Sequence, residues 1–338
     1  MFLQFKNRQL LYLSILAVIA LLITGCGANE ETNEGQTETE ENTNETNDNT
    51  EESASYTVEH AMGTTEVPAT PQKIVILTNE GTEALLAMGI KPIGAVKSWT
   101  GDPWYPHIAD QMDGVQVVGT ESEVNLEAIV ALQPDLIIGN KMRQEAIYDQ
   151  LKAIAPTIFA ETLRGDWKVN FELYSKAIDK EDEGEQVIGN FDSRINELRN
   201  KADLDKEISV VRFMGDHTRI YYTDTFSGVI FDEIGLKRPA QLEEFFADDP
   251  NDMFMRKAGK EQIPQMDGDI LFYFTYETGD GTASATETEM LNDPLWQNLT
   301  AVQEGNVYKV DDAIWNTAGG VLAANLMLDD LEKYIIKE

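Results

Sequence analysis

Short apolar runs alternate with segments of helical periodicity along most of the chain. Apolar, β-branched runs are typical of buried strands, and apolar positions three and four residues apart are typical of amphipathic helices. In the first half, the pattern predicts strands at 73–77, 93–96, 115–118 and 135–139, and helices at 82–88 and 125–132. This alternation favours a parallel sheet flanked by helices.

The second half repeats this order. Strands are expected at 208–213, 220–223, 269–275 and 307–310, and helices at 228–234 and 320–336. The segments GTEALLAMGIKP (81–92) and SGVIFDEIGLKRP (227–239) place a helix, a glycine and a proline at similar spacing. We therefore expect two α/β lobes of related architecture.

A charged segment with a helical apolar period lies between the two halves. Its apolar positions are Val187, Ile188, Phe191, Ile195 and Leu198. A helix of about 30 residues would be about 45 Å long, enough to cross from one lobe to the other, although Gly184 can interrupt it. The predicted fold class is α/β, with two similar lobes joined by a single long helix and a ligand cleft between the lobes.

The N-terminus has the pattern of a secretory signal. Lys6 and Arg8 precede an apolar run at 10–23, which is too short to span a bilayer comfortably. Cys26 follows; it is the only cysteine, and it lies where a lipobox places the residue that carries the lipid. We expect acyl chains on Cys26, palmitate among them, to anchor the protein at the extracytoplasmic face of the cell membrane. The alternative is an ordinary signal peptide with an incidental cysteine.

The charge distribution divides the chain further. Residues 28–55 hold ten acidic residues and no Lys or Arg, so they are expected to form an extended, solvated tether. The remaining part has 50 acidic and 24 basic residues, and this net negative charge argues against nucleic acid as a partner. The expected divisions are a signal peptide at 1–25, a lipidated cysteine and tether at 26–55, lobes at 56–165 and 207–338, and the connecting helix at 166–206.

Several motifs together resemble the iron-siderophore binding proteins of bacterial ABC importers, whose lobes are joined by one rigid helix. The motifs are PQKIVILTNEGTEALLAMGIKPIG, SEVNLEAIVALQPDLIIGNKMRQE, VVRFMGDHTRIYYTD, FSGVIFDEIGLKRP, NDPLWQNLTAVQEGNVYKVD and AIWNTAGG. The resemblance implies a shallow cleft that closes little and holds a ferric siderophore of hydroxamate or citrate-hydroxamate type. The siderophore itself would hold the iron, so no cofactor is implied. It also implies a monomer that delivers its ligand to an ABC permease.

Candidate ligand residues follow from the rule that ligands bind beyond the carboxyl ends of the strands in open α/β sheets. Arginine offers a planar fork for carboxylate and hydroxamate oxygens, and Trp and Tyr offer broad apolar area with a polar handle. Because Arg212 lies inside an apolar strand, it must face either a buried acid or the cleft. The expected ligand-binding residues are Lys97, Trp99, Tyr105, Lys141, Arg143, Arg212, His217, Tyr276 and Trp315.

A second site is implied by the resemblance alone. In that family, one acidic residue on each lobe docks onto the membrane permease. The matching positions are Glu127 in NLEAI and Glu233 in FDEIG. Without the resemblance, both would be read as ordinary exposed glutamates.

The same sequence leaves some alternative ligands open and disfavours other functions. Haem and cobalamin binding proteins of the same superfamily remain alternatives, because Tyr and Met, which can ligate haem iron, are plentiful. A catecholate siderophore also remains open, since Lys97, Arg143 and Arg212 could provide three bases. An enzyme is disfavoured because Gly-x-Ser-x-Gly and a phosphate-binding glycine loop are absent from the sequence. With His60, His107 and His217 as the only histidines, a zinc or manganese binder is also disfavoured.

Overall fold

The computed structural model describes residues 55–163 and 165–336, and the expected signal peptide, Cys26 and tether therefore lie outside the described residues. The first lobe contains a parallel sheet in the order β5-β4-β3-β6-β7. A hairpin of β1 and β2 packs beside it. The strands are β1 Ser55–His60, β2 Gly63–Pro68, β3 Ile74–Ile76, β4 Gly94–Ala95, β5 Gln116–Val117, β6 Leu136–Asn140 and β7 Thr157–Ala160.

Helices follow the strands of this lobe, as the alternating pattern predicted. Thr78 caps the first helix, because its hydroxyl accepts a hydrogen bond from the backbone N–H of Gly81 at 3.0 Å. Asn125 caps the second helix in the same way, accepting from the N–H of Ala128. The helices are α1 Asn79–Ala87, α2 Leu126–Leu132, α3 Lys141–Gln144 and α4 Tyr148–Lys152.

The second lobe contains a mixed sheet in the order β10-β9-β8-β11-β12. Strands β8, β11 and β12 are parallel, whereas β9 and β10 run antiparallel to their neighbours. The turn 214–217 is too short for a parallel crossover, so β8 and β9 form a hairpin. The strands are β8 Ile208–Phe213, β9 Thr218–Tyr221, β10 Met255–Ala258, β11 Ile270–Thr275 and β12 Val307–Lys309.

Helix α7 of this lobe begins as α1 does. Thr225 accepts a hydrogen bond from the N–H of Gly228 at 2.9 Å, which repeats the Thr-x-x-Gly cap of the first lobe. This match supports the predicted relation between the lobes. The helices are α7 Phe226–Ile234, α8 Ala240–Phe246, α9 Thr282–Leu291, α10 Pro294–Gln297, α11 Thr300–Glu304 and α12 Val321–Ile335.

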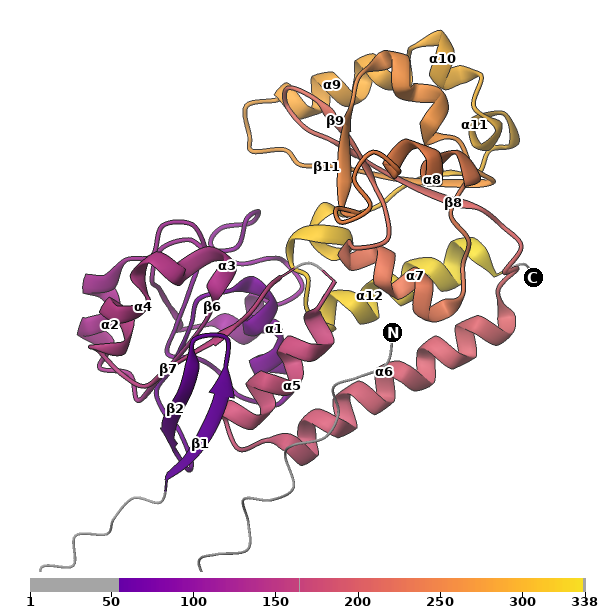
Figure 1. The fold of residues 1–338 in the computed structure, drawn as a ribbon. Coiled ribbons are helices and arrows are strands. Elements are labelled where there is room, and N and C mark those ends of the chain that lie inside the picture. Colours follow the sequence, from indigo (N-terminus) through magenta and orange to yellow (C-terminus); the bar gives the residue numbers. More distant parts are fainter. Residues whose placement is uncertain (1–54, 164, 337–338) are drawn as a thin grey trace, which may run out of the picture. The chain divides into compact units, whose positions relative to one another are not determined.

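The segment between the lobes contains two helices, not one. Helix α5 spans Trp167–Ala177, and α6 spans Glu181–Lys201 and leads toward β8 (Figure 1). The break falls at Asp179, whose backbone has a positive φ of 56°. Gly184 does not interrupt α6: a Cβ at this position would lie 2.7 Å from the Cβ of Ser175, so Gly184 allows α5 and α6 to approach closely.

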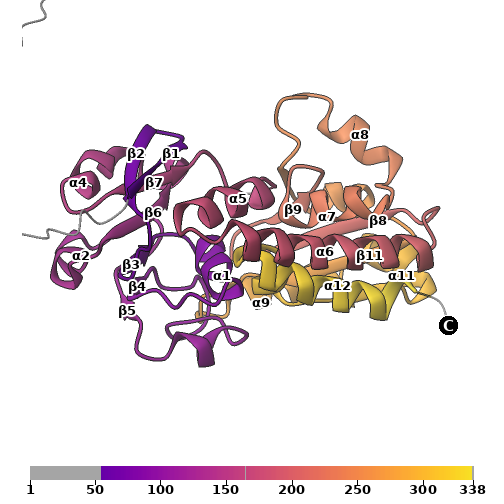
Figure 2. The same ribbon diagram turned by 90° about the horizontal axis from the view of Figure 1, so that it is seen from below.

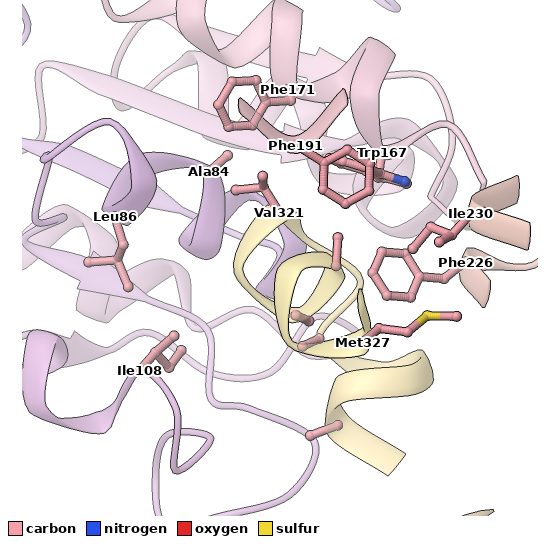
Figure 3. Packing of buried hydrophobic residues seen from close by; sticks show 14 of the residues in the cluster. Ala84, Leu86, Ile108, Trp167, Phe171, Phe191, Phe226, Ile230, Val321 and Met327 are labelled. Atoms are coloured by element: carbon pink, nitrogen blue, oxygen red, sulfur yellow. The ribbon is translucent and has the colours of Figure 1, made fainter. Parts of the chain in front are cut away.

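An apolar core continues from α1 through α5 and α6 to α7 and α12. Figure 3 shows Trp167 and Phe191 beside Phe226, with Val321 of α12 nearby. The Trp167 ring centroid lies 5.1 Å from that of Phe191 and 6.2 Å from that of Phe226. Helices α6 and α12 pack side by side (Figure 2). The lobes therefore share one continuous core. None of the helices at 55–163 and 165–336 combines the length and apolar character that a bilayer-spanning helix requires.

A buried carboxylate joins the first and last helices. Glu83 of α1 accepts a hydrogen bond from the backbone N–H of Ala323 at the start of α12 at 2.9 Å. Its other oxygen lies 2.5 Å from Nε2 of His107. A Cβ on Gly320 would lie 2.6 Å from Oε2 of Glu83, so the backbone of Gly320 presses directly against this carboxylate. A negative charge at the N-terminus of α12 is favourable because it offsets the helix dipole.

Candidate functional site

A cleft of about 470 Å³ is lined by residues of both lobes. On each lobe, the lining includes residues at or just beyond the carboxyl ends of parallel strands, where open α/β sheets bind ligands. The first lobe contributes Glu80, Trp99, Glu121, Met142, Arg143 and Leu163. The second lobe contributes Arg212, Met214, Arg219, Tyr221, Phe226, Phe254, Tyr276 and the segment 316–319.

Arg143 lies on the first-lobe side of the cleft. It belongs to the short helix α3, which Asn140 caps by accepting from the N–H of Met142 at 2.9 Å. The guanidinium carbon lies 5.8 Å from the centroid of the Trp99 ring. Its Nε lies 3.6 Å from Oε2 of Glu121, and 39% of the side chain is exposed. Arg143 is therefore only partly neutralised and can still reach a ligand.

Glu121 is a buried acid that faces the cleft. Its Oε1 accepts hydrogen bonds from both the backbone N–H and the side-chain amide of Asn79, each at 2.8 Å. Burial raises the pKa of Glu121, while the bonds from Asn79 and the charge of Arg143 oppose that shift. These groups limit the upward shift, and the Oε2 atom lies toward Nε of Arg143.

Glu80 is also buried, and its hydrogen-bond partners in the described part of the chain are neutral. Its Oε1 accepts hydrogen bonds from the amide of Asn170 at 2.9 Å and from the hydroxyl of Tyr174 at 3.2 Å. Burial raises the pKa of Glu80 well above its usual range, which favours the neutral acid. Glu80 is therefore a polar residue of the cleft lining whose environment favours the neutral form.

Arg212 forms the second-lobe wall and is only 5% exposed. It makes a bidentate pair with Asp312, with Nε donating to Oδ1 at 2.6 Å and Nη2 donating to Oδ2 at 3.0 Å. Its guanidinium carbon lies 4.7 Å from the ring centroid of Tyr276, which also lines the cleft. The sequence predicted that Arg212 faces either a buried acid or the cleft; it does both, because it pairs with the buried Asp312 and lines the cleft.

Arg219 is a cleft residue that the sequence analysis missed. It lies on β9 directly opposite Arg212 on β8. Its Nε donates to Nε2 of His217 at 3.0 Å, and no carboxylate partner is found for it within the described ranges. The rule of strand carboxyl ends did not find it, because the antiparallel β9 brings its first residues, not its last, to the cleft edge. The alternation in HTRIYY, once β9 is recognised as a hairpin strand, is the signal that could have found it.

Four other predicted ligand residues do not line this cleft. Lys97 lies 4.0 Å from Asp102, and Lys141 pairs with Glu161 at 2.7 Å. The buried Tyr105 accepts a hydrogen bond from the backbone N–H of Trp99 at 3.4 Å, so it supports the loop that carries Trp99. His217 lines a separate hollow on the second lobe.

Trp315 corrects the sequence interpretation most clearly. It is 1% exposed, and its indole N–H donates to Asp330 at 2.8 Å. Its ring packs 4.5 Å from the centroid of Phe272 in the core. The wide helical turn Ala313–Thr317 directs this ring inward, and the residues that follow it, 316–319, line the cleft instead.

The two predicted docking glutamates have different surroundings. Glu127 is exposed in the first turn of α2. Glu233 lies near the end of α7, where its Oε2 is 2.5 Å from the ammonium of Lys168. Lys168 also pairs with Asp192 at 2.7 Å. Docking through these residues stays a prediction.

Comparison with known proteins shows which family shares this sequence and architecture. The family model described as "Periplasmic binding protein" matches residues 74–314. The chain is 53% identical, over 98% of its own length and 99% of the relative's, to "Probable siderophore-binding lipoprotein YfiY" of Bacillus subtilis. It is 29% identical, over 78% of its length and 86% of the relative's, to the "Achromobactin-binding periplasmic protein" of Dickeya dadantii.

The solved structures agree with the sequence relatives. The structure of Staphylococcus aureus SirA complexed with staphyloferrin B matches with a TM-score of 0.75 and 34% identity. That match covers 82% of this chain and 98% of the other. The predicted fold class of two α/β lobes around a cleft is therefore confirmed.

Proposed function

Because this chain belongs to the periplasmic binding protein family, we propose that its cleft captures a ferric siderophore outside the cytoplasm. The protein is a siderophore-binding component of an ABC importer, and it hands its ligand to the membrane permease for iron uptake. The sequence-based prediction of that family and role is confirmed. Its relatives carry names of binding and transport proteins, and the haem and cobalamin alternatives are not favoured.

Arginine and aromatic side chains line the same cleft of an acidic protein, and this arrangement is the main support for the proposal. Arg143 and Arg219 have donors available, and Trp99 and Tyr276 offer flat apolar surface. A ferric siderophore is a compact, oxygen-rich body that needs charge-assisted hydrogen bonds and broad contacts. Local positive charge in a chain of net charge −34 also steers an anionic ligand toward the cleft. The siderophore, not the protein, would coordinate the iron.

We further propose that a lipid anchor attaches the protein to the membrane and that two glutamates contact the permease. Lipidation of Cys26 would keep it at the outer face of the cell membrane, with the acidic residues 28–55 as a tether. It would work as a monomer, and Glu127 and Glu233 would contact the permease. The name of the Bacillus subtilis relative, a lipoprotein, supports the anchor.

Titration of the purified chain with a ligand panel tests the proposed function. The panel contains ferric citrate-hydroxamate, ferric tris-hydroxamate and ferric tris-catecholate chelates, together with haem and cobalamin. Tryptophan fluorescence is a suitable signal because Trp99 lines the cleft. We expect saturable quenching by at least one ferric chelate at sub-micromolar concentration, about −8 kcal/mol or better.

Two controls sharpen this titration. The iron-free siderophore should bind more weakly than its ferric chelate, and Trp99→Phe should remove most of the quenching while calorimetry still detects binding. Binding of haem or cobalamin alone would contradict the siderophore proposal but keep the family. No binding of any ligand would contradict the assignment of the cleft.

A further inference from the structure

The arginines that line the cleft are not equally free to bind an anion. Asp312 binds Arg212 through two hydrogen bonds, and both side chains are only 6% exposed. Glu121 lies 3.6 Å from Arg143 and is itself buried. Arg219 alone among the described lining arginines lacks a carboxylate partner.

These pairings set the charge that a ligand meets. Three guanidiniums line the cleft, and two of them pair with the carboxyl groups of Glu121 and Asp312, while the third buried acid, Glu80, accepts hydrogen bonds from neutral donors. Counted as two ion pairs and one further guanidinium, these groups set the charge of the cleft. The described groups thus leave a single net positive charge. Arg164, which follows the lining residue Leu163, lies outside the described residues and is not part of this count.

Charge matters strongly here because the paired groups are shielded from water. A buried carboxylate repels an incoming anion more than an exposed one, since the local dielectric constant is low and salt screens the interaction poorly. Ferric siderophores differ in charge as well as shape. Counting only Fe³⁺ and its chelating groups, three hydroxamates give a neutral chelate. Two hydroxamates with the citrate carboxylate and alkoxide give a mono-anion, and three catecholates give a tri-anion. The chelates meant here carry no further charged group.

We propose that Glu121 and Asp312 are specificity-determining residues, which limit the positive charge of the cleft and so favour mono-anionic ferric chelates over tri-anionic ones. This inference rests on the proposed function and adds the ligand's charge class to it. Discrimination of this kind uses a repulsive element as well as attractive contacts. Arg219 would supply the principal charged contact to the ligand, and Arg212 would be held in position by Asp312.

The test compares three chelates on the full chain and its variants by calorimetry at low and moderate salt. We expect wild type to bind the mono-anionic ferric citrate-dihydroxamate at least tenfold more tightly than the ferric tris-catecholate. Glu121→Gln and Asp312→Asn each remove one negative charge at nearly constant shape. Each should raise the affinity for the tri-anion, relative to the neutral ferric tris-hydroxamate, by at least tenfold, and low salt should enlarge the change.

The matched control is Glu161→Gln, which makes the same chemical change at an exposed glutamate that pairs with Lys141 outside the cleft. It should leave all three affinities within twofold of wild type. Glu121→Gln keeps the oxygen that accepts from Asn79, so it tests the inference even if Asp312→Asn fails to fold.

The outcomes separate the two claims. A wild-type preference for the tri-anion, or variants that change all chelates by the same factor, would overturn this inference and leave the proposed function standing. Failure of wild type to bind any ferric chelate would overturn the proposed function and this inference together.

Discussion

At the scale of single residues, Arg212 and Arg219 face the same cleft in different states. Arg212 is paired with Asp312, whereas the hydrogen-bond partner of Arg219 within the described residues is His217. A buried ion pair costs much when one partner is removed, because the other charge is left uncompensated. The two arginines should therefore be separable by experiment.

Arg212→Ala is expected to lower the free energy of unfolding by about 3–5 kcal/mol, because Asp312 would remain buried and unpaired. Arg219→Ala should change stability by less than about 1 kcal/mol, yet weaken ferric-siderophore binding by about 1.5–3 kcal/mol. Urea unfolding and calorimetric titration of both variants measure the difference. Equal losses of unfolding free energy in the two variants would contradict the claim that Arg212 stabilises the fold by pairing with the buried Asp312.

Glu80→Gln is expected to change how stability depends on pH. Because burial raises the pKa of Glu80 in the folded chain, the unfolded chain ionises first as pH rises above about 4.5. From there up to the raised folded pKa, this group lowers the free energy of unfolding of the wild type, by at most about 1.4 kcal/mol for each pH unit. Gln cannot ionise, so the free energy of unfolding of the variant should rise relative to that of the wild type as pH increases from about 4.5 toward the raised pKa of Glu80 in the folded chain.

Urea unfolding at several pH values measures this effect. The exposed Glu127→Gln serves as the control and should follow the wild-type curve. Identical pH slopes for wild type and Glu80→Gln would mean that Glu80 is not held in the neutral form.

The rule that ligands bind beyond the carboxyl ends of parallel strands found only some of the residues that line the cleft: Lys97 and Lys141 also follow such strands but do not line it. Trp99, Arg143 and Tyr276 were found by that rule, and the structure places all three on the cleft. Arg219 was missed because the hairpin reverses the chain direction at the cleft edge. Trp315 was misplaced because its sequence neighbours face the cleft, and sequence spacing does not show which way a wide helical turn directs its ring.

At the scale of elements, the strands and helices of the parallel sheet were the most predictable. Their apolar, β-branched runs are buried on both faces, which leaves a strong signal in the sequence. The break between α5 and α6 was not predictable from apolar spacing, because the helical pattern continues on both sides of it. It depends on the backbone conformation of Asp179, for which the sequence offers no glycine or proline.

The contact between α1 and α12 gives an element-scale prediction. Gly320→Ala would place a Cβ 2.6 Å from Oε2 and 2.7 Å from the Cβ of Glu83. Glu83 is buried and accepts a hydrogen bond from the N–H of Ala323, so the added Cβ can fit only if α12 shifts. We expect this shift to lower the free energy of unfolding by about 1–3 kcal/mol.

Gly189→Ala provides the matched control for Gly320→Ala. Gly189 lies within α6 with nothing within 4 Å of an added Cβ, so alanine should raise stability by up to about 1 kcal/mol. Thermal unfolding of both variants checks the pair. If Gly320→Ala were as stable as wild type, the close approach at Glu83 would not hold the helices together.

At the scale of the whole molecule, transport requires a step after ligand capture. We expect Glu127→Ala to leave ligand affinity unchanged but to slow iron uptake in cells, because the side chain is exposed and does not line the cleft. Glu233→Ala should have the same effect. It should also leave Lys168 with Asp192 as its remaining ion-pair partner. Normal uptake by the double variant, at wild-type protein levels, would contradict the docking role.

The contact between Glu83 and Ala323 spans 240 positions along the chain. Forming such a pair has an entropic cost, because a long loop must close before the contact contributes any stability. The first lobe therefore cannot complete its packing on α1 until the final helix has been synthesised. In the export proposed above, the N-terminus would cross the membrane first, and the first lobe would complete its packing only after α12 has crossed.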